Sequence, residues 1–231
     1  MNQIQEMKMR LLKEFAISDD KKTVDFCREA YKFLTEDCNE QPAKPLTEVQ
    51  AIDLGLPSGT LWADRNIGAD VPEGVGLYFS WGNTEGHEFG TDYDFDEDYK
   101  NTEGSKLDGD IDLEHDAARV NMGEPWRMPT EDDFVELCDN CTTSFESLNG
   151  YKGMRFTSKI NGNSIFLPCS GDGDGTSWCV RGSRGYYWSS SLSSAADGRN
   201  LYFRSGGVSP QDYNDRFSGF AVRAVQTSFY Q

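Results

Sequence analysis

The sequence predicts an α+β fold whose short antiparallel strands are concentrated toward the C-terminal end. The composition is rich in glycine and aromatic residues and poor in lysine, which favours strands and turns over a helical bundle. From Ile52 onward, short apolar runs are broken by Gly, Pro, Asn and Asp, whereas sustained helical periodicity is confined to the start of the chain. At 231 residues the chain suits one substantial domain with an appendage, or two small domains.

Residues 1–38 carry the sustained helical signal. Two apolar stripes recur at spacings of three and four residues, the first formed by Ile4, Met7, Leu11 and Phe15 and the second by Val24, Cys27, Tyr31 and Leu34. Ser18, which precedes two aspartates, is a candidate N-cap for the second helix. We expect a hairpin of two short helices, which either packs on the main domain or binds sister chains or a larger assembly. The second alternative predicts a homo-oligomer or a larger assembly held through residues 1–37.

A linker and one larger domain are expected after this segment. Residues 39–50 contain two prolines, as is typical of a linker, and residues 51–226 form the predicted domain. Inside it we expect a helix at Thr130–Cys138 with Thr130 as its N-cap. Asn161-Gly162 predicts a hairpin turn, and the glycine-rich residues 171–175 predict another turn. The expected strands are Met154–Ser158, Ser164–Leu167, Tyr186–Ser190, Leu201–Arg204 and Phe220–Val225.

The negative charge of the chain is concentrated in one region. The formal net charge is −17, and residues 92–116 hold eleven carboxylates against two lysines. A chain this acidic is a poor nucleic-acid binder, because phosphate contacts need clustered cations. No apolar stretch approaches the length of a membrane span, and the N-terminal sequence shows no secretory signal. We therefore expect neither a nucleic-acid partner nor a membrane span.

Two patterns are weak candidates for metal chemistry, and no cofactor is expected. Asp108, Asp110 and Asp112 alternate along the chain and are candidate calcium ligands, although the continuation of an EF-hand loop is missing and a solvated acidic loop is the simpler interpretation. Cys138 and Cys141 have the spacing of redox and zinc sites, but no second such pair exists, so a core role for Cys138 is favoured. The six cysteines leave disulfides and free thiols both open.

No sequence motif points to an enzyme. The chain has no recognisable Ser/His/Asp arrangement, phosphate-binding glycine loop or zinc-protease motif. Paired carboxylates for glycoside hydrolysis remain an alternative, because acids are abundant and their separation in space is not visible in a sequence. A carboxylate or metal enzyme is therefore the least favoured of the functional classes.

The strongest functional signal is the composition of residues 181–225. Tyr, Ser, Gly, Asn and Arg dominate there, as they do in antibody binding loops. If Leu201 and Phe203 point inward on an alternating strand, then Asn200, Tyr202 and Arg204 point outward together. Neighbouring loops, including 212–215, would add Tyr213, Asn214 and Arg216 at the edge of this face. Trp188, Phe203 and Phe220 are expected in the core.

Several motifs in one order resemble a known family. They are Ile52–Ala69 (IDLGLPSGTLWADRNIGA), Tyr78–Gly82 (YFSWG), Trp126–Thr130 (WRMPT), Asn163–Pro168 (NSIFLP), Gly185–Ser191 (GYYWSSS) and Val222-Arg223. This series resembles the Fibrobacter succinogenes major paralogous domain family. The resemblance covers about residues 51–226 and leaves the first 45 residues unexplained.

The resemblance implies a C-type-lectin-like fold and a similarity to the variable proteins of diversity-generating retroelements. Such proteins display variable residues on the C-terminal part of the scaffold. The display face implied for this chain comprises Arg184, Tyr186, Asn200, Tyr202, Arg204, Tyr213, Asn214 and Arg216. The Glu-Pro-Asn and Trp-Asn-Asp signatures of calcium-dependent sugar-binding lectins are absent, which argues against calcium-mediated sugar binding. The reactive cysteine pair of formylglycine-generating oxidases, which share the broad fold, has no counterpart either.

These observations predict a non-enzymatic recognition or attachment protein with a Tyr/Arg/Asn-rich binding surface. One hypothesis is a phage virion component, located on the virion surface, that binds a host cell-surface glycan or protein and docks through residues 1–38. The alternative is a secreted bacterial adhesin or glycan-binding protein on the bacterial cell surface.

Overall fold

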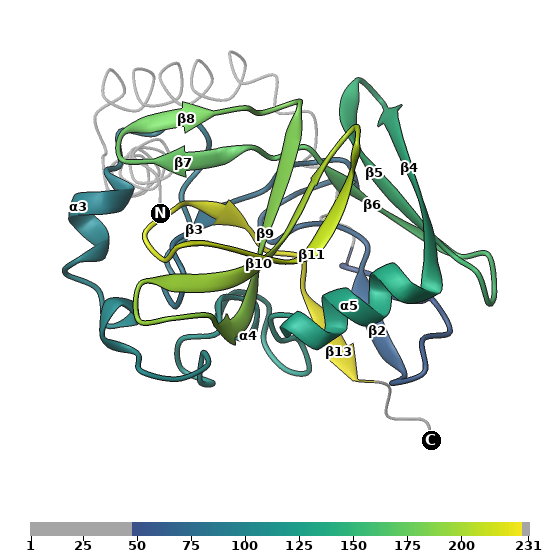
Figure 1. Ribbon diagram of the computed structural model, residues 1–231, viewed down its shortest axis with the longest axis horizontal. Helices are drawn as coiled ribbons and strands as arrows, with labels where there is room; N and C mark the ends of the chain where they lie inside the picture. The colour runs from purple at the N-terminus through teal and green to yellow at the C-terminus, as the bar shows by residue number, and fades with distance from the viewer. Residues whose placement is uncertain (1–47, 228–231) are drawn as a thin grey trace, which may run out of the picture. The chain divides into compact units, whose positions relative to one another are not determined.

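The computed structural model of the protein describes residues 48–227, which belong to one unit beginning at Glu48. The helical stripes predicted within residues 1–38, and most of the predicted linker, lie outside the described residues. The described unit is mixed α+β with mostly antiparallel sheets and few helices, so the predicted fold class is confirmed at that level. Its ribbon is shown in Figure 1.

The unit contains thirteen strands, three α-helices and one 3-10 helix among the described residues. The strands are β1 (Ala51–Asp53), β2 (Thr60–Ala63), β3 (Tyr78–Phe79), β4 (Cys141–Leu148), β5 (Tyr151–Ser158), β6 (Ser164–Pro168), β7 (Asp172–Asp174), β8 (Ser177–Cys179), β9 (Arg184–Leu192), β10 (Asp197–Arg204), β11 (Gly207–Asp215), β12 (Phe220–Ala221) and β13 (Val225–Thr227). The helices are α3 (Phe95–Tyr99), η1 (Gly104–Lys106), α4 (Ala117–Met122) and α5 (Glu131–Asn140).

Four sheets organise these strands. The largest has the order β11-β10-β9-β12-β3, and all its pairings are antiparallel except that of β12 with β9. A meander of β4, β5 and β6 forms a second sheet, and β7 pairs with β8 in a hairpin. The other three-stranded sheet, β1-β2-β13, brings together both ends of the described chain. In Figure 1, β9, β10 and β11 lie between the β7–β8 hairpin and helix α5.

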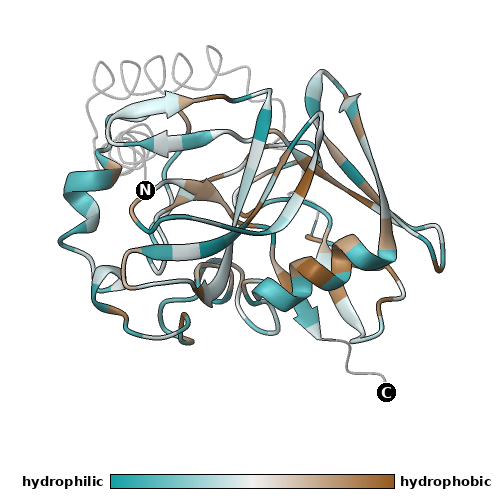
Figure 2. Cartoon of the chain, in the orientation of Figure 1, coloured by the Kyte–Doolittle hydropathy of each residue, from teal (hydrophilic) through white to brown (hydrophobic). Residues whose placement is uncertain are grey.

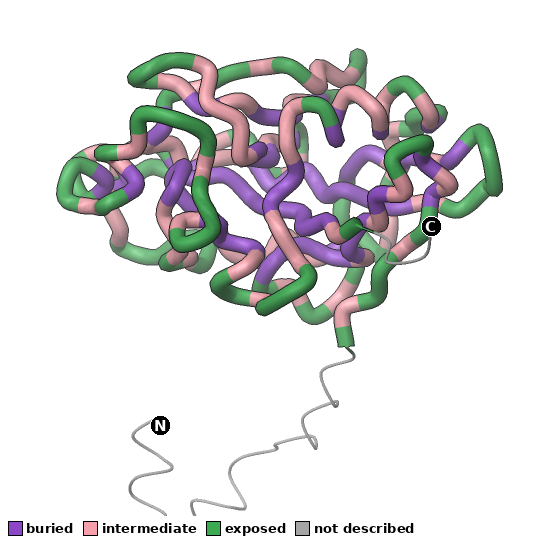
Figure 3. The backbone as a smooth tube through the Cα atoms, turned by 90° about the horizontal axis from the view of Figure 1, so that it is seen from below, coloured by how far each residue is buried: buried purple, intermediate pink, exposed green. Residues whose placement is uncertain are grey.

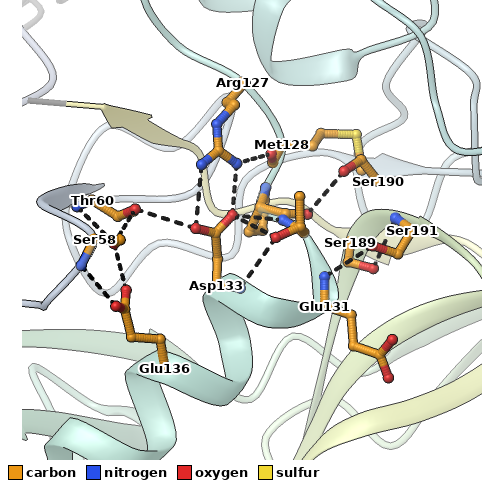
Figure 4. A network of polar contacts seen from close by, with 12 residues as sticks. Ser58, Thr60, Arg127, Met128, Glu131, Asp133, Glu136, Ser189, Ser190 and Ser191 are labelled. Atoms are coloured by element: carbon orange, nitrogen blue, oxygen red, sulfur yellow. Dashed lines mark hydrogen bonds and ion pairs between the residues drawn. The ribbon is translucent and has the colours of Figure 1, made fainter.

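Helix α5 begins where the sequence predicts, and a capping box explains why. The Thr130 hydroxyl accepts a hydrogen bond from the backbone N–H of Asp133 (3.2 Å), and the Asp133 carboxylate accepts one from the backbone N–H of Thr130 (2.8 Å). The same carboxylate accepts from Arg127 (2.6 Å) and from the Thr60 hydroxyl (3.2 Å). Figure 4 shows this buried carboxylate as the centre of a network that joins α5 to β2.

Two further contacts fix the orientation of α5. The Ser58 backbone N–H and hydroxyl donate to the Glu136 carboxylate at 2.8 and 2.5 Å. At the start of the helix, the backbone N–H of Glu131 donates to the Ser191 hydroxyl of β9 at 3.0 Å. Figure 2 shows hydrophobic and hydrophilic residues mixed along α5, and its buried residues include Phe134 and Leu137. The helix is therefore attached to the large sheet by both polar and apolar contacts.

The core consists of two hydrophobic clusters. The first contains Trp62, Phe134, Leu137, Phe156 and Phe203 among its buried members, and the second contains Phe79, Trp81, Trp188 and Phe220. Tyr187 of β9 belongs to the first cluster and its neighbour Trp188 to the second, as the alternation of side chains along a strand requires. The predicted core positions of Trp188, Phe203 and Phe220 are thus confirmed. Figure 3 shows the buried backbone running through the middle of the unit, with exposed residues concentrated in the loops.

Two local predictions need correction, and one long strand has no counterpart among the predicted elements. The strand expected at 220–225 is split into β12 and β13, because backbone groups of Val222 and Ala224 bond outside these two strands, to Ile67 and Ala63. The prediction of a turn over residues 171–175 is wrong. Asp172–Asp174 is a strand that pairs with β8, and the turn begins only at Gly175. The eight-residue strand β4 was not predicted; it pairs with β5 along its whole length.

Candidate ligand-binding surface

Strands β9 and β10 bring two arginines and two tyrosines onto one face of the large sheet. Arg204 lies opposite Arg184, and Tyr202 lies opposite Tyr186, in the antiparallel register. Opposite residues of a strand pair share a face, as do residues two positions apart along one strand. All four side chains therefore point to the same side, at the end of the sheet where β9 begins and β10 ends. We refer to these four residues as the Tyr–Arg cluster.

The two tyrosines are held by a stack of aromatic rings that reaches the core. The ring centroids of Tyr186 and Tyr202 are 5.0 Å apart with an interplanar angle of 38°. Tyr186 stacks on Phe220 at 4.8 Å, and Phe220 stacks on Trp188 at 4.2 Å. The indole N–H of Trp188 donates to the Phe79 carbonyl at 2.8 Å. Both tyrosines are half-buried, so this stack fixes their rings while leaving part of each accessible.

The two arginines are exposed and lie at directly opposite positions. Among residues 48–227, neither Arg184 nor Arg204 has a carboxylate within 4.0 Å. Arg184 Nη1 donates a long hydrogen bond of 3.5 Å to the Tyr186 hydroxyl. Like charges directly opposite on neighbouring strands destabilise a sheet. The cluster therefore holds positive charge that the described protein groups do not neutralise.

The Asp172 carboxylate of β7 interacts electrostatically with Arg184 on this face. The Gly171 N–H donates to the Arg184 carbonyl at 2.9 Å, which holds the start of β7 beside β9. Burial raises the pKa of Asp172 to about 6; Asp174 adds to the shift, and Arg184 opposes it. Burial likewise raises the pKa of Tyr186, so its hydroxyl stays protonated at neutral pH. The Tyr–Arg cluster thus combines cations and phenolic hydroxyls, and the Asp172 carboxyl, with its raised pKa, acts on Arg184 from β7.

The predicted exposure of Asn200 is wrong. The alternation places it on the face of Tyr202, but it lies opposite Trp188 and is fully buried. At this end the face is covered by Trp81, which approaches so closely that a Cβ added at Gly198 would lie 2.5 Å from its ring. The side-chain oxygen Oδ1 of Asn200 accepts a hydrogen bond from the side-chain amide of half-buried Asn214 at 3.0 Å. Asn200 and Asn214 therefore link β10 to β11 instead of facing solvent together.

The predicted display role of Arg216 is also corrected, because this side chain is buried. Its guanidinium donates to the carbonyls of Leu107 and Ala195, each at 3.0 Å, and to that of Gly104 at 2.5 Å. It also lies over the Trp81 ring, 4.6 Å from the centroid. Arg216 thus attaches part of the acidic segment 92–116 to the sheet.

Tyr213 is exposed, as predicted, but it lies on the other side of the sheet. The predicted loop 212–215 is the end of strand β11, and Tyr213 lies opposite Arg199 of β10. The Arg199 guanidinium is 5.9 Å from the Tyr213 ring, and its Nε is 3.6 Å from a carboxylate oxygen of Glu131 in α5. The side that carries α5 is the one opposite the Tyr–Arg cluster. Four of the eight predicted site residues thus come together, and four do not.

The structure also contains an aromatic surface that sequence reasoning missed. Trp178 of β8 packs against Tyr78 and Phe89, with centroid distances of 5.0 and 5.1 Å. Phe89 is exposed, and the exposed Arg181 lies 4.4 Å above its ring. The sequence gives no periodic signal for these residues, because they come from loop-rich segments far apart in the chain.

The predicted calcium ligands do not converge. Asp110 accepts from the Leu192 backbone (2.8 Å), and Asp112 accepts from the ring and backbone of His115 (2.7 and 3.1 Å). Both of these aspartates, like Asp108, are exposed. In the described part of the chain no group of three His, Cys, Asp or Glu side chains is arranged to hold a metal ion.

The four described cysteines are free thiols. Burial raises the pKa of Cys138 to about 12 and that of Cys141 to about 11. Both thiols are therefore poor nucleophiles at neutral pH. Cys138 packs against the first hydrophobic cluster, in agreement with its predicted core role.

Comparisons of the chain with protein-family models, with curated proteins and with solved structures find no match. The family resemblance and the C-type-lectin-like fold therefore stay predictions. Within residues 48–227, no helix has the length and apolar character needed to cross a lipid bilayer.

Proposed function

We propose that this protein is a non-enzymatic recognition protein and that its Tyr–Arg cluster contacts the ligand. The observation that carries this proposal is the register of β9 and β10, which sets an arginine pair beside a tyrosine pair on one accessible face. Tyr and Arg are the residue types that most often dominate binding energy at protein surfaces. The arginine pair is unfavourable for the sheet itself, which is expected of residues kept for binding and not for stability.

The aromatic stack supports the same conclusion. Binding is weakened when side chains must be ordered on contact, at about 0.5–1.5 kcal/mol for each flexible side chain. Tyr186 is already held between Tyr202 and Phe220, and Phe220 rests on Trp188. The cluster is therefore largely preorganised before any ligand arrives.

We further propose that the protein is a phage virion component that attaches to a host cell-surface glycan or protein, with residues 1–38 as its docking segment. This part rests on the helical stripes of the sequence and on the family resemblance. Deleting residues 1–38 should strongly reduce the copy number of the protein on purified particles. Normal incorporation of the truncated protein would contradict this role and would favour the alternative of a bacterial surface adhesin.

The binding role is tested with a paired substitution. Tyr202→Ala with Arg204→Ala should weaken binding of the intact protein to its target on glycan arrays and whole bacterial cells by about 2 kcal/mol, or roughly thirtyfold. The matched control is Tyr213→Ala with Lys152→Ala, which removes an exposed tyrosine and an exposed cation elsewhere. If the control weakens binding as much as the test pair, the Tyr–Arg cluster is not the contact surface.

A further inference from the structure

The arginine pair is unusual in this chain because the protein as a whole is strongly acidic. The formal net charge is −17, yet Arg184 and Arg204 lie opposite each other without a carboxylate in ion-pairing range among the described residues. The groups that influence Arg184 are Tyr186 on the same strand, Tyr202 on β10 and the partly buried Asp172 on β7. Two exposed guanidiniums on adjacent strands repel each other, and a bound anion would remove this repulsion.

The geometry suits a planar anion. Each guanidinium presents several N–H donors in a rigid fork that matches the two oxygens of a carboxylate. Opposite side chains on paired strands start about 5 Å apart at Cβ, so both forks can reach one anionic group. One donor of Arg184 already points to the Tyr186 hydroxyl, which leaves its other donors toward solvent.

The segment that leads into β9 is strained, and it positions Arg184. Val180 has φ of +45°, in the left-handed region that a β-branched residue rarely adopts. Its carbonyl accepts from the N–H groups of both Ser183 (3.0 Å) and Arg184 (3.2 Å). A tight turn therefore begins β9 at Arg184 itself, which fixes the backbone from which this arginine extends.

We propose that the Tyr–Arg cluster binds a glycan that carries carboxylate groups, with Arg184 and Arg204 on the carboxylate and the rings of Tyr186 and Tyr202 on the sugar. This inference rests on the proposed recognition function and names its ligand class. The two half-exposed rings, tilted by 38°, offer an aromatic surface broader than a single ring. The C–H groups of a sugar ring pack on such a surface, and phenolic hydroxyls bond to sugar hydroxyls.

The same features disfavour two other anionic partners. A nucleic acid needs an extended track of cations along its phosphates, whereas the cluster offers one arginine pair in a strongly acidic protein. An acidic peptide would use the guanidiniums but has no flat C–H face for the paired tyrosines. The carboxylated glycan is the partner that uses all four side chains.

The test compares immobilised polygalacturonate with its fully methyl-esterified form, using the intact protein. Esterification removes the charge and keeps the sugar backbone, so we expect at least tenfold weaker binding to the ester. Dextran sulfate and neutral dextran separate carboxylate recognition from general anion and general sugar binding, and poly-glutamate represents an acidic peptide. Arg184→Gln with Arg204→Gln should weaken polygalacturonate binding at least tenfold. Lys152→Gln with Lys159→Gln, which removes the same charge from exposed lysines, should leave it unchanged.

The outcomes separate this inference from the proposed function. The ester or neutral dextran could bind as tightly as polygalacturonate, by contacts that depend on Tyr202. That result would overturn the carboxylate inference and keep the recognition role. Stronger binding to poly-glutamate or dextran sulfate than to polygalacturonate would also overturn it. Binding to polygalacturonate that the arginine substitutions do not change would place the glycan elsewhere. If neither these probes nor bacterial cells are bound through the cluster, both proposals fail.

Discussion

Arg216 and Arg223 are buried arginines whose partners are mainly backbone carbonyls. Arg223 is fully buried and donates to the carbonyls of Ala63 and Phe166 and to the side-chain oxygen of Asn66, at 2.9–3.1 Å. Desolvation lowers its pKa to about 10, which still leaves it charged at neutral pH. Each guanidinium thereby holds together segments that are distant in sequence.

These arginines explain one limit of the sequence prediction. Arg204 and Arg216 lie in the same Tyr/Arg-rich segment, yet one is exposed and the other is buried. Composition identifies the segment as a binding candidate, but it cannot show which guanidinium is surrounded by carbonyls from residues about a hundred positions earlier. Asn200 was misplaced for a similar reason, because the covering Trp81 comes from a distant loop.

Asp172 gives a pH-dependent prediction. Its folded pKa of about 6 lies above its ordinary value of 3.8, so the folded state binds this proton more tightly. The contribution of Asp172 to stability is therefore favourable at low pH and is lost as the pH rises from about 4 to about 6. Asp172→Asn should raise the free energy of unfolding at pH 7.5 by about 1 kcal/mol, since solvent screening at this half-exposed site reduces the effect. It should change little near pH 4.

Urea unfolding at both pH values measures this effect. Asp92→Asn, on an exposed loop, is the control for removing one negative charge from an acidic protein. The other charged or titratable groups around Asp172 are Asp174, Arg184, Tyr78, Tyr186 and Cys179. A gain of stability that is the same at both pH values would show that the carboxyl of Asp172 is not responsible.

At the scale of the elements, the alternation of side-chain directions along β10 was predictable, whereas the residues that cover one of its faces were not. Leu201 and Phe203 point to the core and Tyr202 and Arg204 to the other face, as the period of two requires. Helix α5 was predictable because its capping signal is local. The β-bulges near Asn200 and the pairing of residues 207–215 as a strand depend on partner strands, so no local sequence signal predicts them.

A substitution at Gly185 tests how tightly β9 and β10 are packed. A Cβ at this position would lie 2.2 Å from the ring of buried Phe203, so Gly185→Ala should destabilise the protein by about 2 kcal/mol through overpacking. Gly206→Ala is the control, because a Cβ there meets nothing within 4 Å. Thermal unfolding of both variants measures the difference. Equal stability of the two would mean that the Phe203 ring moves aside freely.

At the scale of the whole molecule, unbalanced acidity should be visible in the salt dependence of stability. A net charge of −17 creates self-repulsion in the compact state. Raising sodium chloride from about 0.01 M to about 0.15 M shortens the screening length from about 30 to about 8 Å. We expect the melting temperature to rise by about 3 °C, which corresponds to about 1 kcal/mol.

Calcium chloride at equal ionic strength is the control for this measurement. A rise no larger than that with sodium chloride is expected from screening alone, whereas a larger rise would revive the hypothesis of calcium ligands at Asp108, Asp110 and Asp112. A melting temperature that falls with added salt would contradict the self-repulsion argument. It would show that favourable ion pairs, such as that of Arg127 with Asp133, dominate the electrostatic energy.

The small sheet β1-β2-β13 has a consequence for engineering. Because β1 and β13 flank the same strand and run parallel to each other, Ala51 and Thr227 are separated by two strand spacings, about 10 Å across the sheet, and by three residues of β2, about 10 Å along it. Residues 48–227 could therefore be spliced into a surface loop of an unrelated carrier protein through short linkers. The Tyr–Arg cluster is built on a different sheet from these ends, so such a graft would leave it free. Because both of its ends lie in one small sheet, the unit can be inserted into another protein as a single piece.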